Sequence, residues 1–294
     1  MTVRLCCQRD LTGRPRWLVR DTAAGTDEVL PDGIALASLV RPGGLDDLRG
    51  SGVAGDVLSE SLLAPVDPYT EVWAAGVTYE RSLRARAEES SIPDVYDRVY
   101  VADRPEIFFK AVGWRISGPG QAIAVRADSA WNVPEPELAV VLDPEGKIFG
   151  WTICNDVSSR SIEAENPLYL PQAKTYLGSC ALGPWITLAG PDLDPADLSI
   201  SLVIERAGAK LWQAETSTRL LHRRIDELAE HLFRADIFPA GVVLATGTGL
   251  VPPDDITLSD GDVVRIAIAG LGELANPTVV GWVPDARQRA ATVT

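Results

Sequence analysis

The alternation of apolar and polar positions is clearest in the middle of the chain. Two apolar runs, at 138–142 and 148–154, are separated by the turn-forming residues 143–146. This pattern is typical of an antiparallel β-hairpin with a short loop. Pairing of the two strands across a loop of this length places Leu142 opposite Lys147.

Further strands are predicted where short apolar runs are bounded by glycine, proline or other turn residues. They occupy 3–7, 16–20, 72–79, 105–110, 199–205, 210–214, 242–249 and 260–268, with one more beginning at 183–185. The runs at 199–205 and 210–214 predict a second hairpin around Gly208.

Two longer segments have helical character. Residues 80–91 are rich in Glu, Arg and Ala, which favour helix. In 218–235 an apolar face recurs with a period of about 3.6 residues. Its members are Leu221, Ile225, Leu228 and Leu232. A helical turn is predicted at 157–163, and the polar segments 93–104 and 170–176 are predicted to be loops.

The chain is expected to divide between residues 62 and 68, where Pro65 and Pro68 work against regular structure. Residues 1–65 then form a small N-terminal domain with both strands and helix, without recognisable chemistry. Residues 66–294 are mostly β. The predicted fold class is α+β, with a small N-terminal α/β module and a mostly β C-terminal domain.

Composition indicates a soluble globular protein, since 46% of the 294 residues are hydrophobic and 23% are charged. The net charge of −14 and the absence of a basic cluster argue against a nucleic-acid partner. We find no signal peptide and no apolar run of about 18 residues. The cysteines, Cys6, Cys7, Cys154 and Cys180, are not spaced for a disulfide framework or a zinc site. We expect a cytoplasmic protein without a membrane partner.

Carboxylates on the central hairpin are candidates for a metal site. Glu135 and Glu137 leave the same face of a strand. The predicted register puts Glu135 near Cys154, and Asp156 then lies one step further along the same face. Three carboxylates without histidine or cysteine suit a hard cation, Mg²⁺ or alternatively Mn²⁺. The other explanation is that the Glu-Pro-Glu sequence only protects a sheet edge from aggregation.

Lysine is rare in this chain. Of the 27 basic residues four are lysines, which leaves 23 arginines. Lys147 and Lys210 follow predicted turns, whereas Lys110 and Lys174 have apolar or motif surroundings. A chain that otherwise uses arginine favours lysine where an amine must lose its proton. Chance retention explains the same pattern.

Two other groups of polar residues allow a structural or a functional explanation. Glu106, Phe108 and Lys110 share one face of a predicted strand, so the charged pair forms either a surface ion pair or part of a site. His222 and His231 lie nine residues apart on the predicted helix, whereas two helical ligands of one metal lie four apart. We therefore expect the histidines to be structural.

Several short motifs occur in the order in which one enzyme family carries them. They are Gly76-x-Thr78-Tyr79, Phe108-Phe109-Lys110, Glu135-x-Glu137, Asn155-Asp156-Val157-Ser158-x-Arg160, Lys174 with Gly183-Pro184-Trp185, and Gly261-Asp262-Val263 with Gly272 and Asn276-Pro277. Through them, about residues 70–282 resemble the fumarylacetoacetate hydrolase family. The resemblance implies a mixed β-roll catalytic domain, a homodimer or homotetramer, and Mg²⁺ held by Glu135, Glu137 and Asp156.

One motif departs from the hydrolases of this family. They carry Gly-x-Asn-Tyr-x-x-His-x-x-Glu, in which the histidine and glutamate activate water. This chain has Ser82 and Ala85 at those positions, and neither side chain takes a proton from water near neutral pH. The segments 76–82, 105–110 and 134–137 instead resemble the dehydratase branch of the family, which acts on 2-keto-3-deoxy sugar acids such as 2-keto-3-deoxyarabinonate.

The resemblance therefore implies a Mg²⁺-dependent lyase of sugar acid catabolism. A 2-keto acid chelates the metal, which acts as a Lewis acid and stabilises an enolate, and the 4-hydroxyl then leaves by β-elimination. Lys174 is the predicted base, provided that burial and the cation leave its amine uncharged, and Glu106 is the predicted acid. The residues implied to bind the small-molecule substrate are Tyr79, Arg160, Thr248 and Ser82.

Two alternatives stay open. The first keeps other chemistries of the family, namely hydrolysis of a carbon–carbon bond in a diketo acid, or decarboxylation or tautomerisation of oxaloacetate. The second is a non-catalytic protein that binds a chelating acid.

Overall fold

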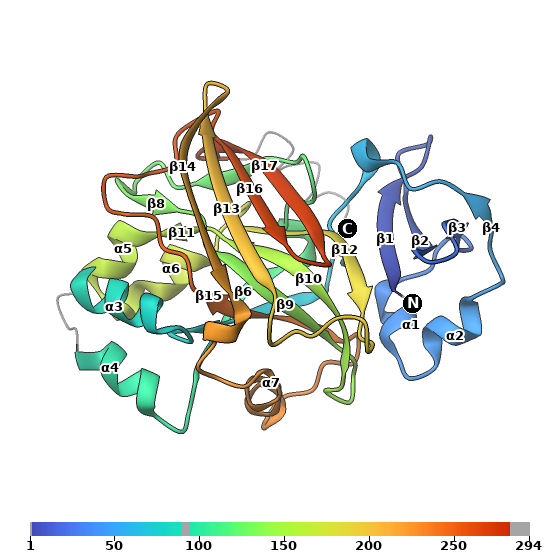
Figure 1. Ribbon diagram of the computed structural model, residues 1–294, viewed down its shortest axis with the longest axis horizontal. Helices are drawn as coiled ribbons and strands as arrows, with labels where there is room; N and C mark the ends of the chain where they lie inside the picture. The colour runs from blue at the N-terminus through green and yellow to red at the C-terminus, as the bar shows by residue number, and fades with distance from the viewer. Residues whose placement is uncertain (1, 90–93, 283–294) are drawn as a thin grey trace.

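Two β-sheets packed on each other form the centre of the molecule in the computed structural model, which describes residues 2–89 and 94–282 (Figure 1). The larger sheet has ten strands, in the spatial order β4 (Val53–Gly55), β3 (Thr26–Val29), β2 (Pro15–Asp21), β1 (Val3–Arg9), β12 (Cys180–Leu188), β10 (Ile148–Asp156), β9 (Pro136–Leu142), β15 (Val242–Thr248), β5 (Glu71–Gly76) and β6 (Glu106–Val112). The smaller sheet has five, in the order β14 (Ala209–Ser217), β13 (Ser199–Arg206), β16 (Val263–Ile268), β17 (Gly272–Val280) and β7 (Ile123–Val125). A two-stranded ribbon pairs β11 (Ser158–Ser159) with β8 (Asn132–Val133).

The helices are short, and those on the left of Figure 1 gather at one end of the sheets. They are α1 (Leu36–Val40), α2 (Gly44–Leu48), α3 (Glu80–Glu89), α4 (Asp94–Val101), α5 (Arg160–Glu165), α6 (Leu170–Lys174) and α7 (Ile225–Phe233). Four 3₁₀ turns lie at Ser59–Ser61, Gly113–Arg115, Pro167–Tyr169 and Thr218–Leu220. Among the described residues, no helix has the length and apolar character needed to cross a membrane.

Strand β9 is buried on both faces, which explains its continuous apolar run. On one face Leu138 packs in a core with Leu202 and Ile266 of the smaller sheet. On the other face Val141 belongs to a second core that includes Leu36 of α1. Both cores hold the hairpin in place, so the polar side chains at its end are attached to a rigid support.

The predicted central hairpin is confirmed as β9 and β10, but its register was predicted wrongly. Leu142 pairs with Ile148 rather than with Lys147. The loop is one residue longer than predicted, because the N–H of Asp143 donates to the carbonyl of Lys147 at 2.9 Å. A bulge between Ile148 and Gly150 then shifts the register by a second residue.

These two shifts cancel in their effect on side-chain direction. A slip of one residue turns every side chain to the other face of a strand, but a slip of two does not. Glu137 therefore pairs with Cys154, and the N–H of Asp156 donates to the carbonyl of Glu135 at 2.9 Å. Asp156 shares a face with both glutamates, as predicted.

The strands of the first 65 residues continue the large sheet. In β1, Arg4 pairs with Thr187 of β12 and Leu5 pairs with Ile186. Strands β2, β3 and β4 follow outward from β1. The division of the chain into domains at residue 65 stays a prediction.

Two predicted loops are wrong, because each contains a helix. Within the predicted loop 93–104, of which residue 93 lies outside the described residues, α4 forms where Val95 and Val99 recur one turn apart and Tyr96 is buried. The predicted loop 170–176 begins with α6, whose Pro171 lies in the first turn, where its missing N–H costs no hydrogen bond.

The predicted helix at 218–235 is shorter than expected, since α7 begins at Ile225. Leu221 instead forms a bridge to Tyr79, and the N–H of His222 donates to the carbonyl of Thr78 at 2.8 Å. These contacts hold the segment before α7 in an extended form. His222 is therefore not on the helix, whereas His231 is.

The packing of the core beneath the smaller sheet predicts how much stability a shortened core side chain costs. Leu202 is fully buried, so Leu202→Ala is expected to lower the free energy of unfolding by about 2–5 kcal/mol. Leu11 is fully exposed, and Leu11→Ala is expected to change that free energy by less than about 0.5 kcal/mol. Urea denaturation of both variants measures the difference, and equal effects would contradict the packing described.

Candidate metal and substrate site

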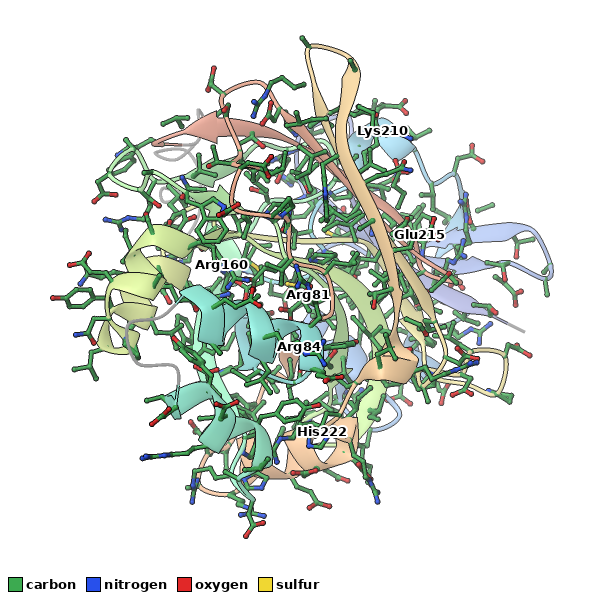
Figure 2. All side chains as sticks on the ribbon, turned by 60° about the vertical axis from the view of Figure 1, so that its left-hand side comes forward. Arg81, Arg84, Arg160, Lys210, Glu215 and His222 are labelled. Carbon is green, nitrogen blue, oxygen red and sulfur yellow. The ribbon has the colours of Figure 1, made fainter. Side chains whose placement is uncertain are left out.

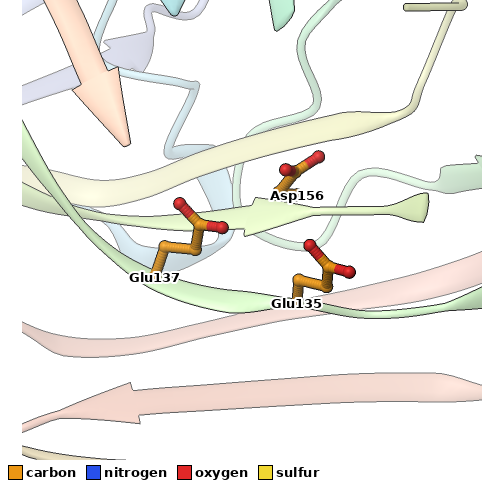
Figure 3. A group of neighbouring side chains, drawn as sticks. All are labelled: Glu135, Glu137 and Asp156. Atoms are coloured by element: carbon orange, nitrogen blue, oxygen red, sulfur yellow. The ribbon is translucent and has the colours of Figure 1, made fainter. Parts of the chain in front are cut away.

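Three carboxylates meet at the end of the central hairpin. Glu135 directly precedes β9, Glu137 lies within it, and Asp156 ends β10. Figure 3 shows their side chains projecting on the same side of the neighbouring strands. One oxygen of each lies within 4.8 Å of the others, and at most 2% of any of the three residues is exposed. The structure thus brings together the predicted metal ligands.

A cavity opens beside these carboxylates. Seven of the nine predicted site residues line it, namely Ser82, Glu106, Glu135, Glu137, Asp156, Lys174 and Thr248. The other two, Tyr79 and Arg160, are buried beyond its lining.

Lys174 lies among the carboxylates. It ends α6, and its Nζ donates to Oε2 of Glu135 at 2.7 Å, to Oδ2 of Asp156 at 2.9 Å and to Oγ of Ser158 at 2.6 Å. The same Nζ lies 5.6 Å from the centre of the Phe108 ring. A single amine therefore reaches two of the three carboxylates and also lines the cavity.

Lys110 has a different environment, although it too is fully buried. Its Nζ lies 2.5 Å from Oδ1 of Asp156 and donates to the carbonyls of Val157 at 3.0 Å and of Lys174 at 2.7 Å. Two hydrogen bonds to backbone carbonyls and one ion pair thus hold the ammonium group. Lys110 thus ties Asp156 to the backbone that carries Lys174. The strand face with Glu106 and Phe108 turns toward the site and is not a surface pair.

Cations surround Glu135. Besides Lys174, Nη2 of Arg160 lies 2.9 Å and Nη2 of Arg86 lies 3.3 Å from its Oε1. Burial opposes ionisation of this carboxyl, but the charges of Lys174, Arg160 and Arg86 outweigh burial and hold its pKa well below the usual range. Glu135 is therefore an ionised anchor of the site.

Glu137 shows the opposite behaviour. Burial, together with the negative charges of Asp156 and Glu135, raises the pKa of Glu137 well above its usual value. The N–H of Gly247 donates to its Oε2 at 2.7 Å. Gly247 has φ +97°, and a Cβ there would collide with the hydroxyl of Thr78, so only glycine brings this N–H to the carboxylate.

Glu106 stands at another wall of the cavity, on the first residue of β6. Burial raises the pKa of its carboxyl, although the charges of Arg86 and Lys174 oppose that effect. Its side chain lies over Gly76, where a Cβ would collide with the carboxylate. A carboxyl that retains its proton at a higher pH is suited to act as an acid.

The four residues predicted to bind substrate differ in their surroundings. The hydroxyl of Ser82 accepts from the N–H of Tyr79 at 3.3 Å and thereby caps the start of α3, and it donates to the carbonyl of Tyr79 at 2.8 Å. The hydroxyl of Thr248 donates to the carbonyl of Leu250 at 3.1 Å. Burial, with the charge of Glu137, raises the pKa of the Tyr79 phenol. Arg160 contacts Glu135, as described above, so its guanidinium group pairs with a carboxylate of the protein itself.

Sequence reasoning missed Arg86 and Glu163. Arg86 on α3 forms an ion pair with Glu163 on α5 in addition to its contact with Glu135, and both residues line the cavity. A signal was present, because Ser82, Ala85 and Arg86 share one face of a helix whose other residues are mostly charged. All three are buried. The face that carries the water-activating pair in hydrolases thus carries a guanidinium group here.

Both histidines of the chain lie within the described residues, and neither lines the cavity. His222 stacks on Tyr100, with ring centroids 4.2 Å apart. Figure 2 shows His222 well separated from Arg160, which marks the site. The prediction that His222 and His231 are not metal ligands agrees with this geometry.

The residues present fit a hard divalent cation. The donor set consists of carboxylate oxygens alone, which magnesium prefers. The raised pKa of Glu137 indicates that the basic groups nearby do not compensate all three carboxylates. An added positive charge at this point would favour the ionised form of Glu137.

Comparison with models of known protein families identifies the class of protein. The sequence model described as "Fumarylacetoacetate (FAA) hydrolase C-terminal" matches residues 71–280. The chain therefore belongs to the fumarylacetoacetate hydrolase family.

Two relatives and one solved structure are more specific. A probable 2-keto-3-deoxyxylonate dehydratase of Haloferax volcanii is 52% identical over 72% of this chain and 73% of its own length. The 2-dehydro-3-deoxy-D-arabinonate dehydratase of Saccharolobus solfataricus is 44% identical over 85% of this chain and 82% of its own. A structure of 2-keto-3-deoxy-D-arabinonate dehydratase complexed with magnesium and 2,5-dioxopentanoate superposes with a TM-score of 0.83 at 38% identity, covering 96% of this chain and 100% of the other.

The opposite pKa shifts of the two glutamates predict opposite effects of amide substitution. The folded-state pKa of Glu137 is above its unfolded value, so its carboxyl disfavours folding once the pH rises above about 4.3. Glu137→Gln is expected to raise the free energy of unfolding of the metal-free protein near about pH 8, and this gain should vanish toward about pH 4.

Glu135→Gln is the matched control for this experiment. It removes the carboxylate that pairs with Lys174 and Arg160, so the free energy of unfolding is expected to fall by about 3 kcal/mol at the same pH. Urea denaturation in EDTA measures both variants. Effects of the same sign would show that the two carboxyls do not differ in the way described.

Proposed function

We propose that this protein is a divalent-metal-dependent dehydratase of a 2-keto-3-deoxy sugar acid, with 2-keto-3-deoxyarabinonate as the expected substrate and Mg²⁺ as the expected ion. One observation carries the proposal. Three metal-competent carboxylates and Lys174 share a cavity whose wall has Ser82 in place of the water-activating histidine of the hydrolases. The names of the two relatives, and the magnesium in the related structure, support the same conclusion.

Glu135, Glu137 and Asp156 would hold the cation, and the substrate would bind through its carboxylate and keto oxygens. A bound divalent cation draws electron density from these oxygens and makes the C3 protons more acidic. Arg86 and Arg160 keep Glu135 in place through ion pairs with its carboxylate. Lys110 does the same for Asp156.

Lys174 is the proposed base. Its Nζ lines the cavity and lies between two of the metal-competent carboxylates, so it lies close to the carbon next to the chelating oxygens. The amine must be uncharged to accept a proton, and Lys110 has no such role because backbone carbonyls hold two of its donors. Lys174 therefore transfers the proton in this proposal, and Lys110 supports Asp156.

Glu106 is the proposed acid. Its carboxyl stands at a different wall of the cavity from the three carboxylates, and burial favours its protonated form. It donates a proton to the 4-hydroxyl, which leaves as water while Lys174 takes a proton from C3. The C3–H and C4–O bonds break, and a double bond forms between C3 and C4.

A second proton transfer completes the reaction to a 2,5-dioxo acid. The Glu106 carboxylate takes a proton from C5, and the Lys174 ammonium returns one to C3. The resulting enol, with its double bond between C4 and C5, tautomerises to the aldehyde. Both side chains thereby recover their starting states, and no water is consumed.

Ser82 and Thr248 are proposed to bind oxygens of the substrate, since both line the cavity. Tyr79 and Arg160 are proposed to assist from behind the lining. Mn²⁺ as an alternative ion, a homodimer or homotetramer, and a cytoplasmic location complete the proposal. Carbon–carbon hydrolysis is disfavoured, because no histidine of the described residues reaches the cavity to activate water.

Mass spectrometry tests the reaction directly. The protein is incubated with Mg²⁺ and 2-keto-3-deoxyarabinonate, and the acid is expected to lose the mass of one water. EDTA should abolish the loss and added Mg²⁺ should restore it, because the chelate activates C3. Fragments from carbon–carbon cleavage would favour the hydrolase alternative, and tight binding without turnover would favour the non-catalytic one.

Substitution of the base gives a further prediction. Lys174→Met is expected to lower kcat by at least about 100-fold, because proton transfer contributes that much or more in many enzymes. Lys174→Arg should fail similarly, since a guanidinium group does not lose its proton. Lys147→Met is the control, because Lys147 pairs with Glu145 on the surface. Turnover by Lys174→Met at the rate of this control would exclude Lys174 as the base.

A further inference from the structure

A second cavity lies beside the site. It shares Glu106 and Glu163 with the cavity of the carboxylates, so these two side chains form a wall common to both. We call it the α4 cavity. Its other lining residues are Val95, Tyr96, Val99, Pro167 and Leu170.

The walls of the α4 cavity are mainly apolar. Val95 and Val99 lie one turn apart on α4 and present the same face of that helix to the cavity. Leu170, the first residue of α6, lines it as well. The carboxylates of Glu106 and Glu163 are therefore the charged groups of the lining, and both stand at the junction with the site.

The lining residues of the two cavities indicate how a bound 2-keto acid would be oriented. The metal-competent carboxylates and Lys174 line the site cavity but not the α4 cavity, whereas Glu106 and Glu163 line both. A 2-keto acid whose C1 and C2 oxygens bind at the carboxylates, with C4 facing Glu106, directs its remaining carbons past Glu106. The α4 cavity lies on that side.

We infer that the α4 cavity receives the end of the acid chain remote from the carboxylate, and that Val95, Val99 and Leu170 determine the chain length that is accepted. This inference rests on the proposed function. A hydroxyl near the junction can donate to Glu106 or Glu163, and carbons beyond it pack on the valines and Leu170. Chains with an apolar end are then favoured over equally long chains with a terminal hydroxyl, which would be buried among apolar groups.

Calorimetry with unreactive 2-oxo acids tests the inference in the presence of Mg²⁺. Pyruvate, 2-oxobutyrate, 2-oxopentanoate and 2-oxohexanoate have no 4-hydroxyl, so they bind without being dehydrated. Once the chain passes Glu106, affinity is expected to rise about fourfold for each added methylene, the value for burial of a CH₂ group. An affinity that does not rise between 2-oxobutyrate and 2-oxohexanoate would overturn the inference.

Substitutions on α4 and α6 test whether the lining of the α4 cavity causes the gain in affinity. Val99→Phe fills the cavity and is expected to remove the gain in affinity for 2-oxohexanoate, while Leu170→Ala enlarges the cavity and should extend the gain to longer acids. Val101→Phe is the matched control, because Val101 lies on the same helix but is 78% exposed, and it should bind the series like the unsubstituted protein. Equal affinities of Val99→Phe and Val101→Phe for 2-oxohexanoate would also overturn the inference.

The same experiment separates this inference from the proposed function. If the affinities rise as expected but no sugar acid loses water, the α4 cavity keeps its role as the chain pocket and the dehydratase proposal is wrong. If 2-keto-3-deoxyarabinonate is dehydrated but the affinities are flat, the dehydratase proposal stands and the chain pocket is wrong.

Discussion

The site depends on placing three carboxylates next to one another in the interior, where like charges repel and water is excluded. The protein compensates them unequally. Glu135 and Asp156 are paired with lysines and arginines, whereas Glu137 has a raised pKa and a backbone N–H as a neighbour. This imbalance makes a divalent cation a natural partner of the site, and it explains why two lysines and two arginines are buried around one end of the central hairpin.

The fold keeps these charges in position by burying the hairpin on both faces. Strand β9 lies between two apolar cores, so the side chains at its end have little freedom to move apart. Lys110 adds a second support, because it binds Asp156 and the carbonyl of Lys174 at the same time. The position of Lys174 thus depends on the packing of strands that contribute no proposed reacting group.

Two side chains of this chain differ from the hydrolase motif of the family, while the scaffold is that of its structural neighbours. With Ser82 and Ala85 on the site face of α3, the cavity lacks the side chains that activate water, and Arg86 on the same face pairs with Glu135 and Glu163 instead. Elimination needs a base and an acid but no nucleophile, and Lys174 and Glu106 are suited to these roles. Glu106, the proposed acid, lines both the site cavity and the α4 cavity, so the proposed proton transfer and the proposed selection of chain length would take place at one wall.

The sequence by itself determined the central hairpin, most strands of the two sheets and the common face of Glu135, Glu137 and Asp156, because strand periodicity and turn residues act over short distances. It did not predict β3, β4, β7, β8, β11 and β17. The common face was predicted correctly although the strand register was wrong, because two single-residue shifts together leave the side-chain directions unchanged. Only the tertiary structure decided that α4 and α6 are helical, that α7 begins at Ile225, and that Arg86, Glu163 and the N–H of Gly247 join the site. The start of α7 and the positions of Glu163 and the Gly247 N–H depend on contacts between segments far apart in the chain, and a local pattern of apolar and polar residues carries no record of such contacts.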